Sequence, residues 1–125
     1  MREEFYAEYY EIENTHWWFL GRWHLFAQAI EQEFGHRSED ITALDVGCGT
    51  GTWLGRLESF GTAYGVDRAP EAVRFCQNRG RARVVQSLAT HLPFDDGSFD
   101  LVCALDLLEH VSDDVQSLRE LSRVC

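Results

Sequence analysis

A glycine-rich segment between two ordered elements constrains the fold of this chain more than any other feature. Residues 44–51 read LDVGCGTG, and the apolar run Ile41–Val46 leads directly into the glycines. Closely spaced glycines let the backbone turn tightly and let a ligand lie against the main chain. Residues 52–60 then have a helical pattern. The segment therefore predicts a buried strand, a ligand-binding turn and a helix, in that order.

Strand-like and helix-like segments alternate along the rest of the chain. Further short strands are expected at 62–66, 83–86 and 99–105, and further helices at about 70–78 and 113–124. Ser112 is expected to cap the last of these helices. Such alternation is typical of a parallel sheet covered by helices on both faces. We therefore expect an α/β fold with three layers.

The N-terminal part of the chain has a different pattern. Residues 3–13 hold five glutamates, and aromatic residues stand between them at helical spacing, which predicts an amphipathic helix. The segment 16–23 is followed by a second helical pattern through 25–34, and Gly35 is its expected end. We expect two parts: residues 1–40 form a helical cap, and residues 41–125 form the core.

Charge and composition argue against several classes of function. The 125 residues carry 21 acidic and 11 basic side chains, a net charge of −10, so a nucleic-acid partner is not expected. No apolar run approaches the ~20 residues that a membrane-spanning helix needs, and the first residues do not resemble a signal peptide. The four cysteines form no C-x-x-C pair and are expected to be reduced thiols. We expect a cytoplasmic protein without a membrane partner.

The nature of the ligand is indicated by two aspartates near the glycines. The second strand ends in Asp67, twenty residues after Gly47, where a nucleoside-binding sheet places the carboxylate that accepts the ribose hydroxyls. A dinucleotide fingerprint G-x-G-x-x-G would need glycine at Thr52, but the third glycine is Gly51. Asp45 would repel a pyrophosphate, whereas it suits a ligand with an ammonium and a sulfonium group. S-adenosylmethionine carries both groups and is the expected cofactor; a nicotinamide-dependent oxidoreductase is the alternative.

Three motifs resemble those of the class I S-adenosylmethionine-dependent methyltransferases: LDVGCGTG at 44–51, GVD at 65–67 and LPFDDGSFDLVCALDLLEHV at 92–111. HWWFLGRW at 16–23 also resembles the N-terminal cap of a bacterial subgroup of these enzymes. The resemblance implies a Rossmann-like methyltransferase fold with the parallel strand order 3-2-1-4. Family domains continue past a segment like 118–124 into further strands, so we expect an incomplete, C-terminally truncated core that lacks those strands.

The resemblance implies contacts between the cofactor and ten residues, which are Asp45, Gly47, Cys48, Gly49, Asp67, Arg68, Leu88, Ala89, Leu105 and Asp106. The residues at 45–49 would hold the methionine end, Asp67 would bind the ribose, and Arg68 would flank the adenine. Leu88 stands where the family often has an acidic residue, so backbone groups or packing at Leu88 and Ala89 must hold the adenine. The last two residues would lie beside the methionine portion or the transferring methyl group.

The segment at 106–110 reads D-x-x-E-H and admits two interpretations. On a helix, Asp106, Glu109 and His110 would share a face and could converge on a divalent cation. The alternative, which we favour, is that Glu109 and His110 belong to the family signature as part of the active-site rim, without a metal. His110 is then the candidate base where an acceptor must lose a proton.

These features together predict methyl transfer to a small-molecule acceptor. The competing hypothesis is a cofactor-binding fragment or half-domain that is inactive without a partner or a further segment. The fourth strand, at about 99–105, would lie at an open edge of the sheet. Because an uncovered strand edge favours association, we expect a homodimer through that edge.

Overall fold

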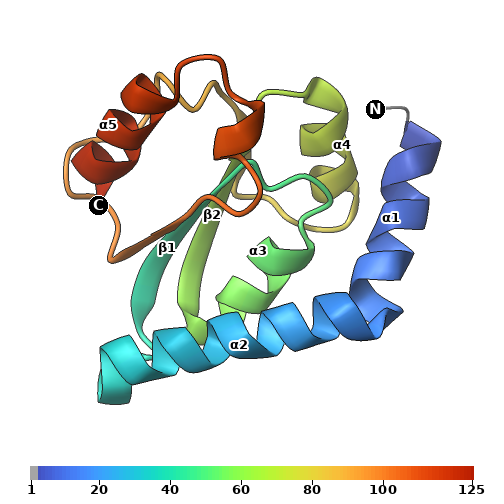
Figure 1. Ribbon diagram of the computed structural model, residues 1–125, viewed down its shortest axis with the longest axis horizontal. Helices are drawn as coiled ribbons and strands as arrows, with labels where there is room; N and C mark the ends of the chain where they lie inside the picture. Colours follow the sequence, from blue (N-terminus) through green and yellow to red (C-terminus); the bar gives the residue numbers. More distant parts are fainter. Residues whose placement is uncertain (1–2) are drawn as a thin grey trace.

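The computed structural model describes residues 3–125 as a parallel sheet with helices on both of its faces (Figure 1). The sheet has the strand order β3-β2-β1-β4. Its strands are β1 (Ile41–Val46), β2 (Gly61–Asp67), β3 (Val84–Gln86) and β4 (Leu101–Cys103). All three pairings between neighbouring strands are parallel. The predicted α/β fold and the strand order are therefore confirmed.

Five α-helices accompany the sheet. They are α1 (Glu3–Thr15), α2 (Trp17–Phe34), α3 (Thr52–Leu57), α4 (Pro70–Asn78) and α5 (Asp114–Val124). The two predicted N-terminal helices are present, and Gly35, with φ +55°, ends the second as expected. The cap of α5 was predicted wrongly, because Asp113 and not Ser112 accepts the hydrogen bond from the backbone N–H of Gln116.

Alternating residues of the strands face two separate hydrophobic layers. Ile41 and Ala43 of β1 pack against α2, α3 and α4, in a cluster that includes Trp23 and Trp53. Leu44 and Val46 of the same strand pack on the opposite face, against side chains of α5 and of the segment before β4. The sheet is thus the middle of three layers, as expected.

The cap helices share the hydrophobic core with the rest of the molecule. Trp23 of α2 stacks on Trp53 of α3 with 5.5 Å between ring centroids, and both rings are about 5 % exposed. Tyr6 of α1 packs on Phe75 of α4 at 5.6 Å. Figure 1 shows α2 crossing the molecule beside the sheet while α1 rises toward α4. The division into a cap at 1–40 and a core at 41–125 stays a prediction.

The fourth strand is shorter than predicted. Backbone ladder pairing with β1 covers Leu101–Cys103, whereas a strand was expected at 99–105. Phe99 instead donates its backbone N–H to the carbonyl of Val124, which ties the start of this segment to α5. Beyond Cys103 the chain turns, and Asp106 has φ +55°. No helix among residues 3–125 is long and apolar enough to span a membrane.

Candidate functional site

The candidate site lies where the carboxyl ends of β1, β2 and β4 meet, which is the usual place for a ligand on an open parallel sheet. The turn after β1 is held by the backbone N–H groups of Gly47 and Cys48, which donate to the carbonyl of Val66 at 2.8 and 3.0 Å. Gly47 has φ +78°, and a Cβ atom there would lie 3.0 Å from Leu107. Only glycine therefore fits this turn without strain or displacement of its neighbour.

Asp67 connects the glycine loop to the end of β2. Its Oδ2 accepts the backbone N–H of Gly49 and its Oδ1 that of Ala69, both at 2.9 Å. Each carboxylate oxygen has two lone pairs, so both oxygens keep the capacity to accept a further hydrogen bond from a ligand. The side chain is thereby fixed in position and still able to bind a pair of hydroxyl groups.

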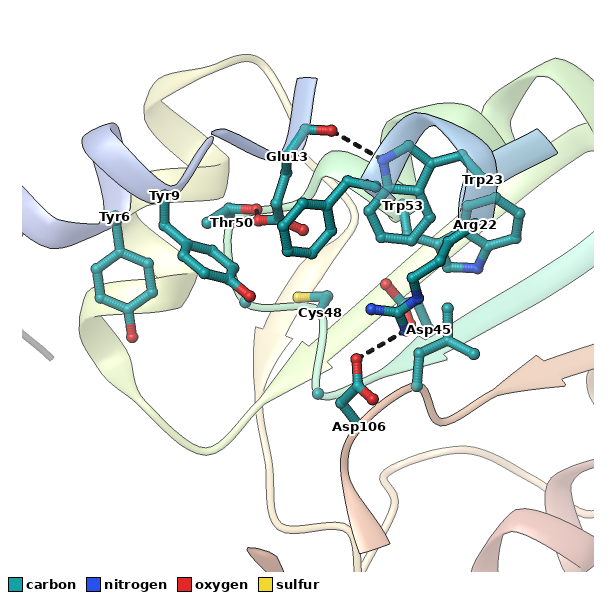
Figure 2. Close-up of a pocket in the computed structure, with 14 residues that line it drawn as sticks. Tyr6, Tyr9, Glu13, Arg22, Trp23, Asp45, Cys48, Thr50, Trp53 and Asp106 are labelled. Atoms are coloured by element: carbon teal, nitrogen blue, oxygen red, sulfur yellow. Dashed lines mark hydrogen bonds and ion pairs between the residues drawn. The ribbon is translucent and has the colours of Figure 1, made fainter. Parts of the chain in front are cut away.

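Two cavities border the glycine loop. The cap cavity, of about 190 Å³, lies between the cap helices and the loop (Figure 2). It is lined by Tyr6, Tyr9, Glu13, Phe19, Arg22, Trp23, Asp45, Gly47, Cys48, Gly49, Thr50, Trp53, Leu105 and Asp106. The outer groove, of about 520 Å³, runs past Asp67, the segment 87–90 and His110. Tyr6, Gly47, Gly49 and Asp106 line both, so the two spaces adjoin.

The structure brings the residues predicted from the sequence to these two spaces. Those expected at the methionine end line the cap cavity; they are Asp45, Gly47, Cys48, Gly49, Leu105 and Asp106. Those expected at the ribose and adenine line the outer groove, as does the candidate base; they are Asp67, Arg68, Leu88, Ala89 and His110. This places them together, and their roles stay predictions.

Asp45 is the most perturbed acid of the cap cavity. It is 3 % exposed, and burial, together with the charges of Asp67 and Glu13, raises the pKa of its carboxyl to about 7. Glu13, on α1, is 8 % exposed, and burial raises its pKa as well, although a hydrogen bond from Thr50 opposes the shift. Two buried carboxylates facing one cavity suit a ligand that brings positive charge.

Cys48 is unsuited to act as a nucleophile. A hydrogen bond with Cys76, together with burial and the nearby Asp45 carboxylate, raises the pKa of the Cys48 thiol. A thiol with a raised pKa is protonated and unreactive near neutral pH. All four cysteines are free, as expected.

The residues at 106–110 do not form the helix that the metal hypothesis required. Leu108–His110 is a short 3₁₀ turn, preceded by Asp106 with a positive φ. The Asp106 carboxylate accepts a hydrogen bond from Arg22 at 2.8 Å, while His110 lies 3.9 Å from Glu109. Within residues 3–125 no group of three histidine, cysteine or acidic side chains is arranged to hold a metal ion.

Sequence reasoning missed two charged residues of the cap helices that line the site, Glu13 and Arg22. Glu13 accepts a hydrogen bond from Thr50 Oγ1 at 2.6 Å, which joins α1 to the glycine loop. Arg22 of α2 reaches Asp106 after β4, 84 residues further along the chain. The sequence shows Glu13 only as one of five glutamates in 3–13 and Arg22 only as an arginine among aromatic residues, and neither pattern is rare enough to identify a site.

Comparison with known proteins identifies the family. A family model described as a methyltransferase domain matches residues 44–125. The chain belongs to the methyltransferase-domain family. The match covers the glycine loop, both sheet aspartates and the segment 92–111, so the resemblance stated for these motifs is confirmed. It begins after the cap, and the resemblance of residues 16–23 to a subgroup stays a prediction.

Individual relatives of this methyltransferase-domain protein are themselves named as methyltransferases. The chain is 34 % identical over 90 residues to norajmaline N-methyltransferase of Rauvolfia serpentina, covering 65 % of this chain and 31 % of that protein. It is 31 % identical over 108 residues to demethylmenaquinone methyltransferase of Staphylococcus aureus, covering 80 % of this chain and 44 % of the relative. The chain thus spans between about a third and a half of these proteins.

Solved structures place the fold in the same family. A SAM-dependent methyltransferase from Aquifex aeolicus superposes with a TM-score of 0.65 and 28 % identity, over 79 % of this chain and 57 % of that one. A putative S-adenosyl-L-methionine-dependent methyltransferase from Methanococcus maripaludis has a TM-score of 0.80 at 20 % identity, over 98 % of this chain and 58 % of that one. The second likeness concerns the fold alone, and it extends over the cap helices.

Proposed function

We propose that this chain binds S-adenosylmethionine and that the protein transfers its methyl group to a small-molecule acceptor. The observation that carries the proposal is the pair of aspartates near the carboxyl ends of β1 and β2, beside the glycine loop. Asp67 offers fixed acceptors to a ribose diol, and Asp45 offers a buried negative charge to a cationic amino-acid end. The family match and the relatives named as methyltransferases support the same conclusion.

The residues present fit this cofactor in their chemistry. The cap cavity joins the outer groove at Gly47 and Gly49, so one elongated molecule can pass along the loop with an end in each space. Leu88 is 56 % exposed at the outer groove, where its apolar side chain could cover the adenine ring. Arg68 would flank the same ring.

The contribution of the protein to catalysis would be mainly positioning. S-adenosylmethionine supplies an electrophilic methyl group on a sulfonium centre. The glycine loop and the two aspartates would hold the donor in one orientation, which reduces the entropic part of the barrier. His110 lines the outer groove with an exposed side chain and is the proposed base where the acceptor carries a proton.

Binding of S-adenosylhomocysteine, the demethylated product, tests the proposal in titration calorimetry. We expect binding by the wild-type chain, no binding of NAD, and a 10- to 150-fold weaker Kd for Asp67→Ala, since a hydrogen bond to a charged group contributes about 1.5–3 kcal/mol. Asp95→Ala, at an exposed loop position outside both cavities, is the matched control. An unchanged Kd for Asp67→Ala would contradict the assignment of the ribose site.

The competing hypothesis is a cofactor-binding unit without activity of its own. It predicts the same calorimetric result but no methyl transfer. Incubation of the chain with labelled S-adenosylmethionine and fractionated small molecules from a cell extract separates the two, because only an active enzyme transfers the label.

The proposal also covers assembly and location. In the part of the chain that the structure describes, β4 is paired with β1 alone. We propose that this edge mediates a homodimer, which should strengthen with salt because screening reduces repulsion between chains of net charge −10. A monomer in light scattering at high micromolar concentration and about 0.5 M salt would refute it. A cytoplasmic location is proposed as well and would suit the four free cysteines.

A further inference from the structure

The cap cavity has an unbalanced set of charges. Its lining includes three carboxylates, Glu13, Asp45 and Asp106, but Arg22 is the one basic side chain among them in the described part of the chain. Figure 2 shows the arginine side chain descending from the cap toward the loop that carries Asp106. A cavity with one cation and several carboxylates is complementary to a group that carries both charges.

Arg22 is held in place by aromatic rings and pairs with the exposed carboxylate of Asp106. Its guanidinium carbon lies 5.5–5.9 Å from the ring centroids of Phe19, Trp23 and Phe26, and the side chain is 19 % exposed. One of its five N–H donors reaches Asp106 at 2.8 Å, whereas the Asp106 side chain is 65 % exposed. The arginine is therefore fixed at the cavity wall, and water can readily replace it as the partner of Asp106.

Glu13 complements the arginine. Its Oε1 accepts the Thr50 hydroxyl at 2.6 Å, and the Trp23 indole N–H donates to its backbone carbonyl at 3.0 Å. These bonds fix the position of the buried carboxylate beside the glycine loop. The second carboxylate oxygen, Oε2, keeps lone pairs for a cationic donor.

We propose that Arg22 and Glu13 are specificity-determining residues for the amino-acid end of the cofactor, and that Asp106 competes with the cofactor for Arg22. Arg22 takes the carboxylate, for which its planar fork is suited, and Glu13 takes the ammonium group. Asp106 loses its partner when the cofactor enters, which frees the turn after β4 at the side where an acceptor would approach. This inference rests on the proposed function, and it adds two residues outside the matched family region at 44–125.

The test compares two ligands that differ only at the end in question. S-adenosylhomocysteine has the amino-acid end, whereas 5′-methylthioadenosine has the same nucleoside and sulfur without it. In titration calorimetry, Arg22→Met should raise the Kd of S-adenosylhomocysteine about ten-fold or more, which is the effect of one lost charge-assisted hydrogen bond. The same change should alter the Kd of methylthioadenosine by less than about two-fold, within the usual error of a remote substitution.

Three further variants sharpen the comparison. Glu13→Gln keeps the shape of the side chain and should likewise weaken the binding of S-adenosylhomocysteine alone, because only that ligand has the amino-acid end. Arg37→Met removes an exposed arginine that pairs with Asp100 at 3.5 Å outside both cavities, and should leave both affinities unchanged. Arg22→Lys keeps the charge without the planar guanidinium, and its affinity for S-adenosylhomocysteine should lie between those of wild type and Arg22→Met. It replaces Arg22→Met in the test if that variant does not fold.

Asp106→Asn tests the competition. Removal of the competing carboxylate should increase the affinity for S-adenosylhomocysteine and leave the affinity for methylthioadenosine unchanged. A lower affinity for S-adenosylhomocysteine would mean that Asp106 contacts the cofactor directly, and would overturn the proposed competition. If Arg22→Met lowered the affinity for both ligands equally, the role of Arg22 would be overturned while the proposed function remained intact. Failure of the wild-type chain to bind either ligand would instead refute the proposed function, and this inference with it.

Discussion

Replacement of Asp45 by asparagine should stabilise the protein at high pH and weaken cofactor binding. Burial raises the pKa of the Asp45 carboxyl from its ordinary value of 3.8 to about 7. An acid whose pKa is raised on folding binds its proton more tightly in the folded state, so folding loses free energy as the pH rises from about 4 to about 7. Asparagine has the same shape without the charge and avoids this loss.

The size of the effect follows from the two pKa values. A shift of roughly three units corresponds to about 4 kcal/mol once the carboxyl is ionised in both states. At pH 5 the unfolded chain is ionised and the folded chain is not, so only about 1.5–2 kcal/mol of that cost is present. The stability difference between Asp45→Asn and wild type should therefore increase by about 2.5 kcal/mol from pH 5 to pH 8.

Urea unfolding, followed by circular dichroism at both pH values, measures this difference. Asp95→Asn, at an exposed loop position, is the control and should show no such increase. Burial of Glu13 contributes to the pH dependence of both proteins in the same direction, so the difference between them reports mainly on Asp45. A difference between Asp45→Asn and wild type that does not change with pH would refute the reasoning. At pH 8 the same variant should bind S-adenosylhomocysteine more weakly, although it is more stable.

Three further predictions concern the scaffold and the metal. Arg123→Met should lower the melting temperature near neutral pH, because Arg123 hydrogen-bonds Glu120 at 2.7 Å and holds the pKa of that carboxyl at about 2; the difference from wild type should shrink as the pH falls from about 4.5 toward 2. Gly61→Ala should prevent normal folding, since its Cβ would overlap the backbone carbonyl oxygen of Ile41 in β1, whereas Gly97→Ala, with φ +65° in open space, should cost only about 1–2 kcal/mol by chemical denaturation. Melting curves with EDTA and with millimolar Mg²⁺ should coincide, because the residues at 106–110 do not converge; a shift that Asp106→Asn abolishes would contradict this.

The core of the fold could be predicted because its signals are local. The apolar run at 41–46, the glycines after it and Asp67 at the end of the next strand each depend on neighbours in the sequence, and each lies where expected. Pro70 begins α4 for a similar reason, since proline fixes the backbone of a first turn. Such features carry their own geometry and need no distant partner.

The errors arose where distant contacts decide the structure. The helix that the less favoured metal interpretation required at 106–110 does not form, because Asp106 adopts a positive φ and its side chain is held by Arg22, 84 residues earlier. The expected strand at 99–105 is shortened because Phe99 bonds to the last turn of α5. Glu13 belongs to the site only because α1 packs over the glycine loop. Local pattern cannot show any of these contacts.

The buried carboxylates of the cap cavity link stability to binding in the proposed function. Aromatic rings of the cap, among them Phe19 and Trp23, line the same cavity as Asp45. Burial raises the pKa of the Asp45 carboxyl, so the ionised carboxyl destabilises the empty protein. The same burial strengthens the attraction between the ionised carboxylate and a cationic ligand, because the effective dielectric constant is lower. A ligand that brings positive charge to the cavity therefore recovers free energy that the empty protein loses on folding.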